Sequence, residues 1–149
     1  MSKPNINLNE FWPVMKEVIE SGGEFTFYPH GTSMLPLIRE GVDQVVLVKA
    51  DFLKKGDAVF YLRDNGQFVL HRVVKIKNGE YIMCGDNQVA LEHGITEKHI
   101  LAKMKAVLRD GFIVDETNAK YRKYVRRLSR RRIKKRVRAF LGRVKRKIF

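Results

Sequence analysis

Three side chains of this sequence could together perform nucleophilic catalysis: a hydroxyl, an imidazole and a carboxylate. Ser33 lies in HGTSMLP, where a preceding glycine permits unusual backbone angles and a following proline stiffens the chain. His71 lies in FVLHRVV, and an imidazole with an ordinary pKa of about 6.5 takes a serine proton at neutral pH. Asp86 lies in CGDN, where its carboxylate would orient the histidine and stabilise the charged imidazole.

Each of these residues also has a purely structural interpretation. A serine between glycine and proline is usually a turn residue, and Gly-Asp-Asn is typical of an Asx turn. A lone histidine on a strand is usually half-buried and bonded to a backbone carbonyl. Glu92 and Asp64 are the reserve candidates for the acid. The residue types alone therefore leave both interpretations open.

Two kinds of element would position these side chains. Apolar residues at helical spacing in NEFWPVMKEVIE predict a short amphipathic helix, capped by Asn9 and ended by Gly22 and Gly23. From Glu24 to about Val114, short runs rich in β-branched and aromatic residues predict an antiparallel meander of strands. The predicted strands are EFTFY, QVVLVK, DAVFYL, QFVLHRVVKIK, EYIMC, ILAKMKAVL and FIV.

Three dipeptides predict tight turns between these strands. Asn65-Gly66, Asn78-Gly79 and Asp110-Gly111 suit two-residue hairpin turns, because both central residues then need a positive φ. His71 would lie inside the longest strand, on the face that it shares with Val69 and Val73. The sequence therefore predicts a mainly β fold in which the His71 imidazole lies between apolar side chains on one face of a strand.

The positive charge of the chain is concentrated at one end. Residues 1–119 hold 14 basic and 16 acidic residues, whereas residues 120–149 hold 16 basic residues and no acidic one. The net charge of +14 therefore belongs to the tail, which needs a function of its own. We expect an N-terminal helix at 1–23, one β-rich domain at 24–118 and a basic helical tail at 119–149.

Composition limits the compartment and the chemistry. Cys84 is the only cysteine, so the chain forms no internal disulfide and no cysteine-based metal cluster. The apolar runs are far shorter than the ~20 residues that cross a bilayer, and the N-terminus has no signal-peptide pattern. We expect a cytoplasmic protein, peripheral at the membrane where its tail binds, with no cofactor and no metal.

Four motifs, in this order, resemble those of type I signal peptidases and LexA-type peptidases. They are G-x-S-M-x-P at 31–36, GDAVF at 56–60, His-Arg-Val at 71–73 and Gly-Asp-Asn at 85–87. The resemblance covers roughly residues 25–108 and implies a coiled, largely antiparallel β structure. Histidine at the position of the base is similar to the branch of endoplasmic-reticulum and archaeal signal peptidases. The resemblance implies Ser33 as nucleophile, His71 as general base and Asp86 as the third member, with Glu92 in reserve.

The chain departs from this pattern near the nucleophile. Bacterial signal peptidases have a hydroxyl two residues before the nucleophile, where this chain has Gly31. The donors to an oxyanion would then be the Ser33 amide and an unidentified partner, with Thr32 as the candidate. Substrate and oxyanion support are assigned to Gly31, Thr32, Met34 and Pro36. A second departure is Val42, which is inserted in GVDQV.

The tail combines basic residues with apolar stripes. One stripe is formed by Tyr121, Val125 and Leu128, and another, on a different face, by Ile133, Val137, Phe140, Leu141, Val144 and Ile148. We expect two amphipathic pieces that change face near SRRR. A basic amphipathic helix suits an anionic membrane surface. Nucleic acid would attract the same cations but leave the apolar stripe without a role, and packing on the domain itself or on a partner protein is the third interpretation.

These observations favour an enzyme. We expect a serine endopeptidase that cuts a leader or signal-like peptide from a peptide or precursor protein, after small side chains as the resemblance implies. The alternative is an inactive peptidase fold that binds a membrane, nucleic acid or protein through its tail. The presence of both Ser33 and His71 favours the enzyme.

Overall fold

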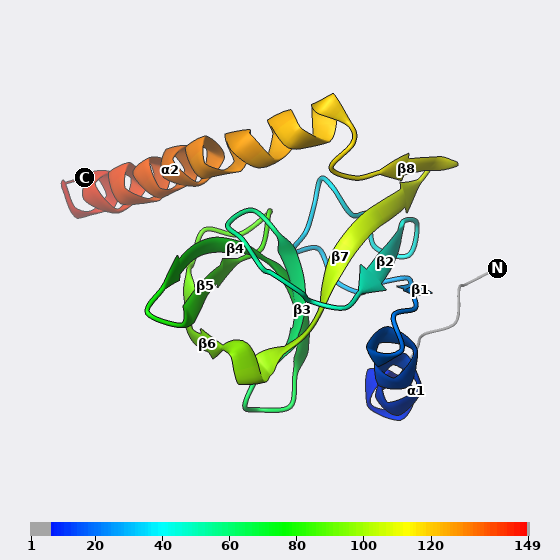
Figure 1. Cartoon of the computed structure of the whole chain (residues 1–149). Helices are drawn as coiled ribbons and strands as arrows, with labels where there is room; N and C mark the ends of the chain where they lie inside the picture. Colours follow the sequence, from blue (N-terminus) through cyan, green and yellow to red (C-terminus); the bar gives the residue numbers. More distant parts are fainter. Residues whose placement is uncertain (1–6, 149) are drawn as a thin grey trace.

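A computed structural model describes residues 7–148, with side chains up to residue 146 (Figure 1). Within these residues the chain forms eight strands, two α-helices and one 3-10 turn. The elements in order are α1 (Leu8–Glu20), β1 (Phe25–Phe27), β2 (Gln44–Val48), β3 (Ala58–Leu62), β4 (Phe68–Lys77), β5 (Glu80–Cys84), β6 (Glu92–Thr96), η1 (Glu97–His99), β7 (Ile100–Arg109), β8 (Phe112–Val114) and α2 (Ala119–Ile148). This confirms a mainly antiparallel β fold with a short N-terminal helix and a C-terminal helix.

The strand order differs from a simple meander. The order is β1-β2-β7-β3-β4-β5-β6, with β8 paired to β7, and all pairs are antiparallel. Only β3 to β6 form a meander, because β7 returns to lie between β2 and β3. Strand β6 was not predicted, since its sequence EHGIT buries only Ile95 and has few residues that favour strands.

The tight turns decide how neighbouring strands are aligned. Asn78-Gly79 and Asp110-Gly111 have positive φ at both residues, as predicted. At Asn65-Gly66 the prediction of a two-residue turn is wrong, because only Gly66 has a positive φ and residues 63–67 form a longer connection. The observed connection places Val59 opposite His71.

Two apolar clusters pack on the two faces of the sheet. Strands β3 to β6 curl around the smaller cluster (Figure 1), which is formed by Val59, Tyr61, Val69, Val73, Met83 and Ile95. The larger cluster lies between the sheet and α1, which buries Met15 and Ile19. Helix α1 begins at Leu8 and is capped by Asn7, whose side chain accepts a hydrogen bond from the Asn9 amide, so the prediction of Asn9 as the cap is wrong.

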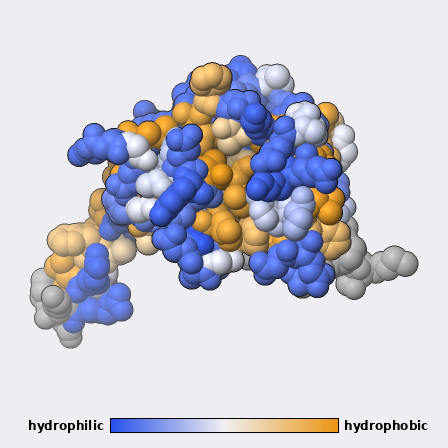
Figure 2. All heavy atoms as spheres, turned by 60° about the horizontal axis from the view of Figure 1, so that its bottom comes forward, coloured by the Kyte–Doolittle hydropathy of each residue, from blue (hydrophilic) through white to orange (hydrophobic). Residues whose placement is uncertain are grey.

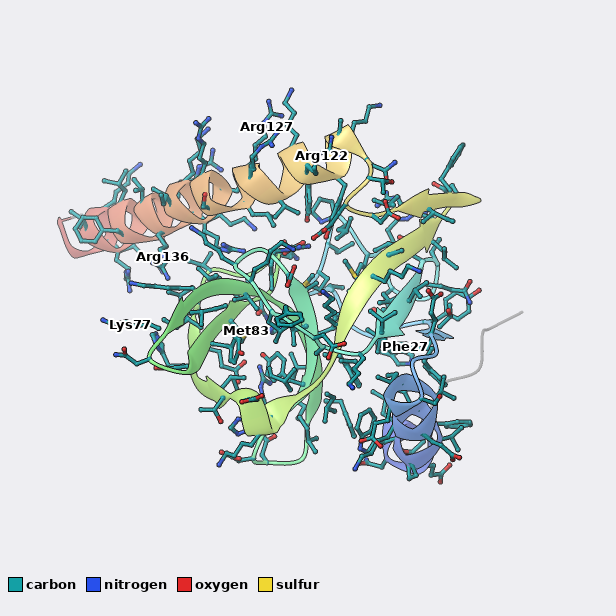
Figure 3. The ribbon with its side chains drawn as sticks, viewed as in Figure 1. Phe27, Lys77, Met83, Arg122, Arg127 and Arg136 are labelled. Carbon is teal, nitrogen blue, oxygen red and sulfur yellow. The ribbon has the colours of Figure 1, made fainter. Side chains whose placement is uncertain are left out.

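Helix α2 is continuous, so the prediction of two pieces is wrong. Its first half packs on the domain through Tyr121, Leu128 and Arg132, which are buried. Its second half projects past β4 and β5 (Figure 1), and its exposed apolar residues are Ile133, Val137, Phe140 and Leu141. The side chain of Ile148 lies outside the described residues. Figure 3 shows Arg127 on the face of α2 turned away from the sheet and Arg136 on the face turned toward it.

Two leucines of α2 test this division of the helix. Leu128 is 1% exposed and Leu141 is 56% exposed. We expect Leu128→Ala to lower the free energy of unfolding by about 2–5 kcal/mol because it leaves a cavity. We expect Leu141→Ala to change it by less than about 0.5 kcal/mol. Urea denaturation followed by circular dichroism measures both, and equal effects would contradict the packing of the first half of α2.

Candidate active site

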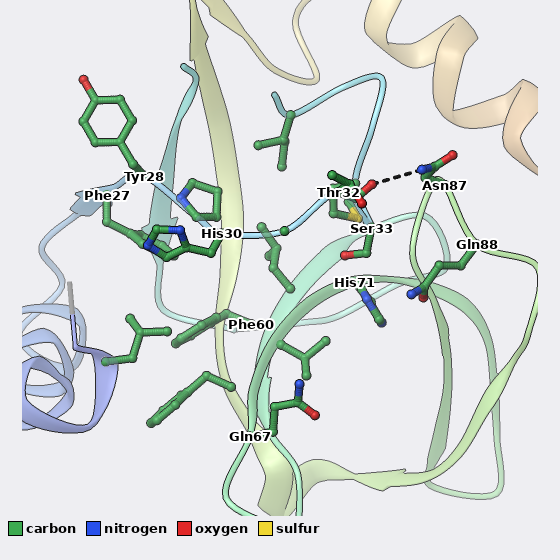
Figure 4. A pocket seen from close by; sticks show the side chains of 18 of the residues that line it. Phe27, Tyr28, His30, Thr32, Ser33, Phe60, Gln67, His71, Asn87 and Gln88 are labelled. Atoms are coloured by element: carbon green, nitrogen blue, oxygen red, sulfur yellow. Dashed lines mark hydrogen bonds between the residues drawn. The ribbon is translucent and has the colours of Figure 1, made fainter. Parts of the chain in front are cut away.

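Ser33 and His71 meet in one cavity although 37 residues separate them in the sequence. Ser33 lies in the loop between β1 and β2, and His71 lies on β4. Both line a cavity of about 480 Å³, and Figure 4 shows their side chains next to each other. Among the hydrogen bonds of residues 7–148, none joins the two side chains. Such bonds are often long in unliganded enzymes and tighten when substrate binds.

The Gly-Asp-Asn segment braces the loop that carries the serine. The Asn87 amide donates to the Ser33 carbonyl at 2.8 Å, and the Asn87 side chain donates to the Thr32 carbonyl at 3.2 Å (Figure 4). A Cβ atom on Gly85 would lie 2.6 Å from the Ser33 carbonyl oxygen, so only glycine allows this approach. The segment therefore sets the position of the Ser33 backbone.

Asp86 does not orient His71, contrary to the prediction. Its carboxylate accepts hydrogen bonds from Arg72 at 2.8 and 2.9 Å and from the Tyr124 hydroxyl at 2.7 Å. The reason lies in the alternation of β4, because adjacent residues of a strand point to opposite faces. Asp86 lies on the side of Arg72, and His71 points to the other side.

Glu92, the reserve acid, reaches His71 through Tyr61. The Tyr61 hydroxyl lies 2.6 Å from the Glu92 carboxylate and 3.3 Å from Nδ1 of His71. Two hydrogen bonds from Arg63, each 2.8 Å long, hold the carboxylate. Burial opposes its ionisation, but the hydrogen bonds from Arg63 and Tyr61 lower the pKa of Glu92.

This chain of hydrogen bonds fixes the protonation of the imidazole. An ionised Glu92 only accepts hydrogen bonds, so the Tyr61 hydroxyl must donate to it. The Tyr61 oxygen then accepts from His71, which places the proton of the neutral ring on Nδ1. Within residues 7–148 no hydrogen bond uses the other ring nitrogen, Nε2, so its lone pair is available as a base.

Burial keeps this imidazole neutral. The His71 side chain is 5% exposed, and its burial, together with the positive charge of Arg63, lowers its pKa to about 4. At neutral pH the ring is therefore in the form that accepts a proton.

The predicted support residues shape the loop around Ser33. Gly31 has a φ of 90°, and its amide donates to Glu40 at 2.9 Å. Met34 is buried, and its sulfur accepts from the Asp86 amide at 3.5 Å. The Pro36 carbonyl accepts from Arg109 at 2.7 Å. None of these bonds reaches the Ser33 hydroxyl within the described part of the chain.

The Ser33 amide is a candidate donor to an oxyanion. No hydrogen bond within residues 7–148 uses the Ser33 amide as a donor, so its N–H remains available. Asp64, the other reserve acid, lies away from the cavity lining and forms a 2.9 Å contact with Nε2 of His99.

Sequence reasoning missed the residues that complete the two networks. Arg72 was readable in principle, because a charged residue inside the apolar run FVLHRVV requires a buried partner. The positions of Tyr61 and Arg63 relative to His71 depend on the register between β3 and β4. The two-residue turn predicted at Asn65-Gly66 would have shifted that register. The hydrogen bond from Tyr124 to Asp86 depends on how α2 packs on the domain, and no local sequence pattern indicates it.

The described residues contain no cluster of three or more His, Cys, Asp or Glu side chains that could hold a metal ion. Cys84 is buried, and burial raises the pKa of its thiol. No helix of the described chain has both the length and the apolar content to cross a bilayer.

Two sequence comparisons with known proteins identify no relative. No protein-family model matches the chain, and a search of curated proteins finds no significant sequence match. The motifs and the geometry of the cavity therefore carry the functional argument.

The lowered pKa of His71 predicts an unusual pH profile. Protonated His71 cannot accept the serine proton, so acylation of Ser33 by a fluorophosphonate should fall with a midpoint at about pH 4 and stay level from about pH 5.5 upward. Arg63→Gln removes a positive charge near the ring and should move the midpoint to higher pH. Acylation rates measured by mass spectrometry test both, and a midpoint of about 6.5 in the unchanged chain would contradict the buried, neutral imidazole.

Proposed function

We propose that this chain is a serine endopeptidase of the signal-peptidase-like kind, in which Ser33 is the nucleophile and His71 the general base. The observation that carries the proposal is the shared cavity, where a buried histidine presents an unprotonated Nε2 beside the serine. Glu92 acts through Tyr61 as the positioning carboxylate.

The reaction follows from these positions. Ser33 Oγ attacks the peptide carbonyl while Nε2 of His71 takes its proton, and the tetrahedral oxyanion forms beside the Ser33 N–H. The Tyr61–Glu92 pair stabilises the imidazolium, which then protonates the leaving amine. Water, activated by the same nitrogen, releases the acyl group from the serine.

The edge of β4 offers a place for an extended peptide. Strand β5 pairs with β4 only from Arg72 onward, so residues 68–71 have β3 as their partner on one side and border the cavity on the other. An unpaired strand edge binds extended chains through backbone hydrogen bonds. A peptide bound along this edge would pass His71 and Ser33.

The second half of α2 supports attachment to an anionic membrane. It projects from the body of the molecule, and Figure 2 shows apolar and hydrophilic side chains side by side on its end. The four exposed apolar residues Ile133, Val137, Phe140 and Leu141 lie among basic residues. Such a helix lies in the membrane interface, with its apolar face in the lipid and its cations at the headgroups. We propose that it holds the peptidase beside its precursor substrates.

The second candidate is a binding module without activity. The same exposed half of α2 favours it, since binding through this surface does not depend on Ser33. The two candidates differ in whether the cavity performs chemistry.

Substitution of the two central residues separates these candidates. We expect Ser33→Ala and His71→Ala each to lower the rate of fluorophosphonate labelling, and of cleavage of a peptide library, by at least about 1000-fold. Ser129→Ala and His93→Ala, which change an exposed serine and an exposed histidine, are the matched controls. Peptide mapping locates the adduct. A folded chain that neither labels nor cleaves would contradict the peptidase and support the binding module.

Binding to vesicles tests the tail. We expect the protein to sediment with phosphatidylserine-containing vesicles and not with phosphatidylcholine alone, less so at high salt. Replacing both Phe140 and Leu141 with serine should weaken binding by at least about tenfold, because apolar surface no longer enters the interface. Val14→Ser changes an exposed apolar residue on α1 and is the control. Unchanged binding of the double variant would contradict insertion of this face, and tight binding to RNA or DNA instead would favour nucleic acid.

A further inference from the structure

The cavity that holds Ser33 and His71 continues into an apolar chamber that the reaction itself does not use. The cavity volume of about 480 Å³ lies in the range of sites that enclose small molecules or side chains. Segments from α1 to β4 contribute its walls, and Figure 4 shows Phe27 and Phe60 across the cavity from the serine. Its apolar lining includes Leu8, Phe27, Ile38, Phe60, Phe68 and Leu70.

The wall of this chamber is held rigid by aromatic contacts. The rings of Phe60 and Phe68 stack, with centroids 5.6 Å apart and an interplanar angle of 12°. The Phe27 ring meets Phe60 edge-on, with a centroid distance of 5.9 Å. The ring of Trp12, from α1, packs against those of Phe60 and Phe68, with centroid distances of 6.2 and 6.1 Å. Because these rings support one another, the chamber is formed before any ligand binds.

Helix α1 supplies one side of the chamber through Leu8. Leu8 is the first residue of this helix and is partly buried. Met15 and Ile19, about two and three turns further on, are buried in the core and fix the helix in place. The position of Leu8 is therefore set by the fold.

We propose that this chamber binds a large apolar side chain, leucine or an aromatic residue, of the peptide whose bond Ser33 attacks; the inference rests on the function proposed above. A large apolar side chain removes the chamber walls from water, whereas alanine leaves them wet. Thr32, Asn87 and Gln88 lie around Ser33 in the same cavity (Figure 4), so the backbone of the peptide lies there and its side chain enters the apolar end. This selectivity differs from the small side chains that the family resemblance implies.

The experiment compares peptides that differ at one position. Alanine, valine, leucine and phenylalanine are placed in turn at each position around the bond found with the peptide library, and kcat/KM is measured for each peptide. At one position, leucine or phenylalanine should exceed alanine by at least about tenfold. A preference for alanine at every position would overturn the inference.

Two variants of α1 tie the selectivity to the chamber. Leu8→Trp places a larger side chain in the wall that α1 supplies and should lower kcat/KM for the leucine and phenylalanine peptides more than for the alanine peptide. Phe11→Trp adds the same side chain to an exposed position of α1 outside the cavity and should leave the ratios unchanged. Equal ratios in the Leu8→Trp variant and the unchanged chain would overturn the inference.

Binding to the Ser33→Ala variant separates this inference from the proposed function. Fluorescence anisotropy of labelled peptides measures affinity without cleavage. If the unchanged chain cleaves nothing, the labelled peptides are polyalanine with and without a single leucine or phenylalanine, and tighter binding of the leucine or phenylalanine peptide by at least about tenfold would uphold the chamber while overturning the peptidase. Equal affinity for the alanine peptide would overturn the chamber as well.

Discussion

Arg72 and Asp86 bury opposite charges in the middle of the molecule, with side chains 1% and 0% exposed. The pair joins β4 to the loop after β5, and the hydroxyl of Tyr124 adds α2 to the same network. Breaking such a pair by removing one partner costs about 3–5 kcal/mol, because the other charge stays buried. The loop that contains Asp86 also braces Ser33, so the ion pair fixes Ser33 relative to His71, the neighbour of Arg72.

Two adjacent residues of β4 thereby serve two separate networks. Arg72 faces the ion pair and α2, whereas His71 faces the curled half of the sheet, where Tyr61 links it to Glu92. This arrangement depends on strand register, because a shift of one residue moves side chains to the other face. With a two-residue turn at Asn65-Gly66, Phe60 would have stood opposite His71, and the hydroxyl would have been lost from this face.

This dependence explains which parts of the structure the sequence could predict. Runs rich in valine, isoleucine and aromatic residues are local signals, and they located β1 to β5, β7 and β8. The insertion of β7 between β2 and β3 is a long-range pairing that no local pattern encodes. The motifs indicated Ser33 and His71 as a pair to examine, but the acid linked to the histidine depends on register. For that reason Glu92 could be named only in reserve, and Tyr61 could not be named at all.

The continuous α2 connects the support of the site to the surface outside it. Its first half is held by the buried Leu128 and by the bond from Tyr124 to Asp86, and its second half extends the same axis into solvent. A continuous helix is stiff, because each residue is hydrogen-bonded to the turn before it. The packed half therefore fixes the direction in which the exposed half extends. If the exposed half lies on an anionic membrane as proposed, the packed half sets the angle between the membrane and the cavity that holds Ser33. The tail would then orient the protein as well as attach it, because it determines from which side a membrane-bound precursor approaches Ser33.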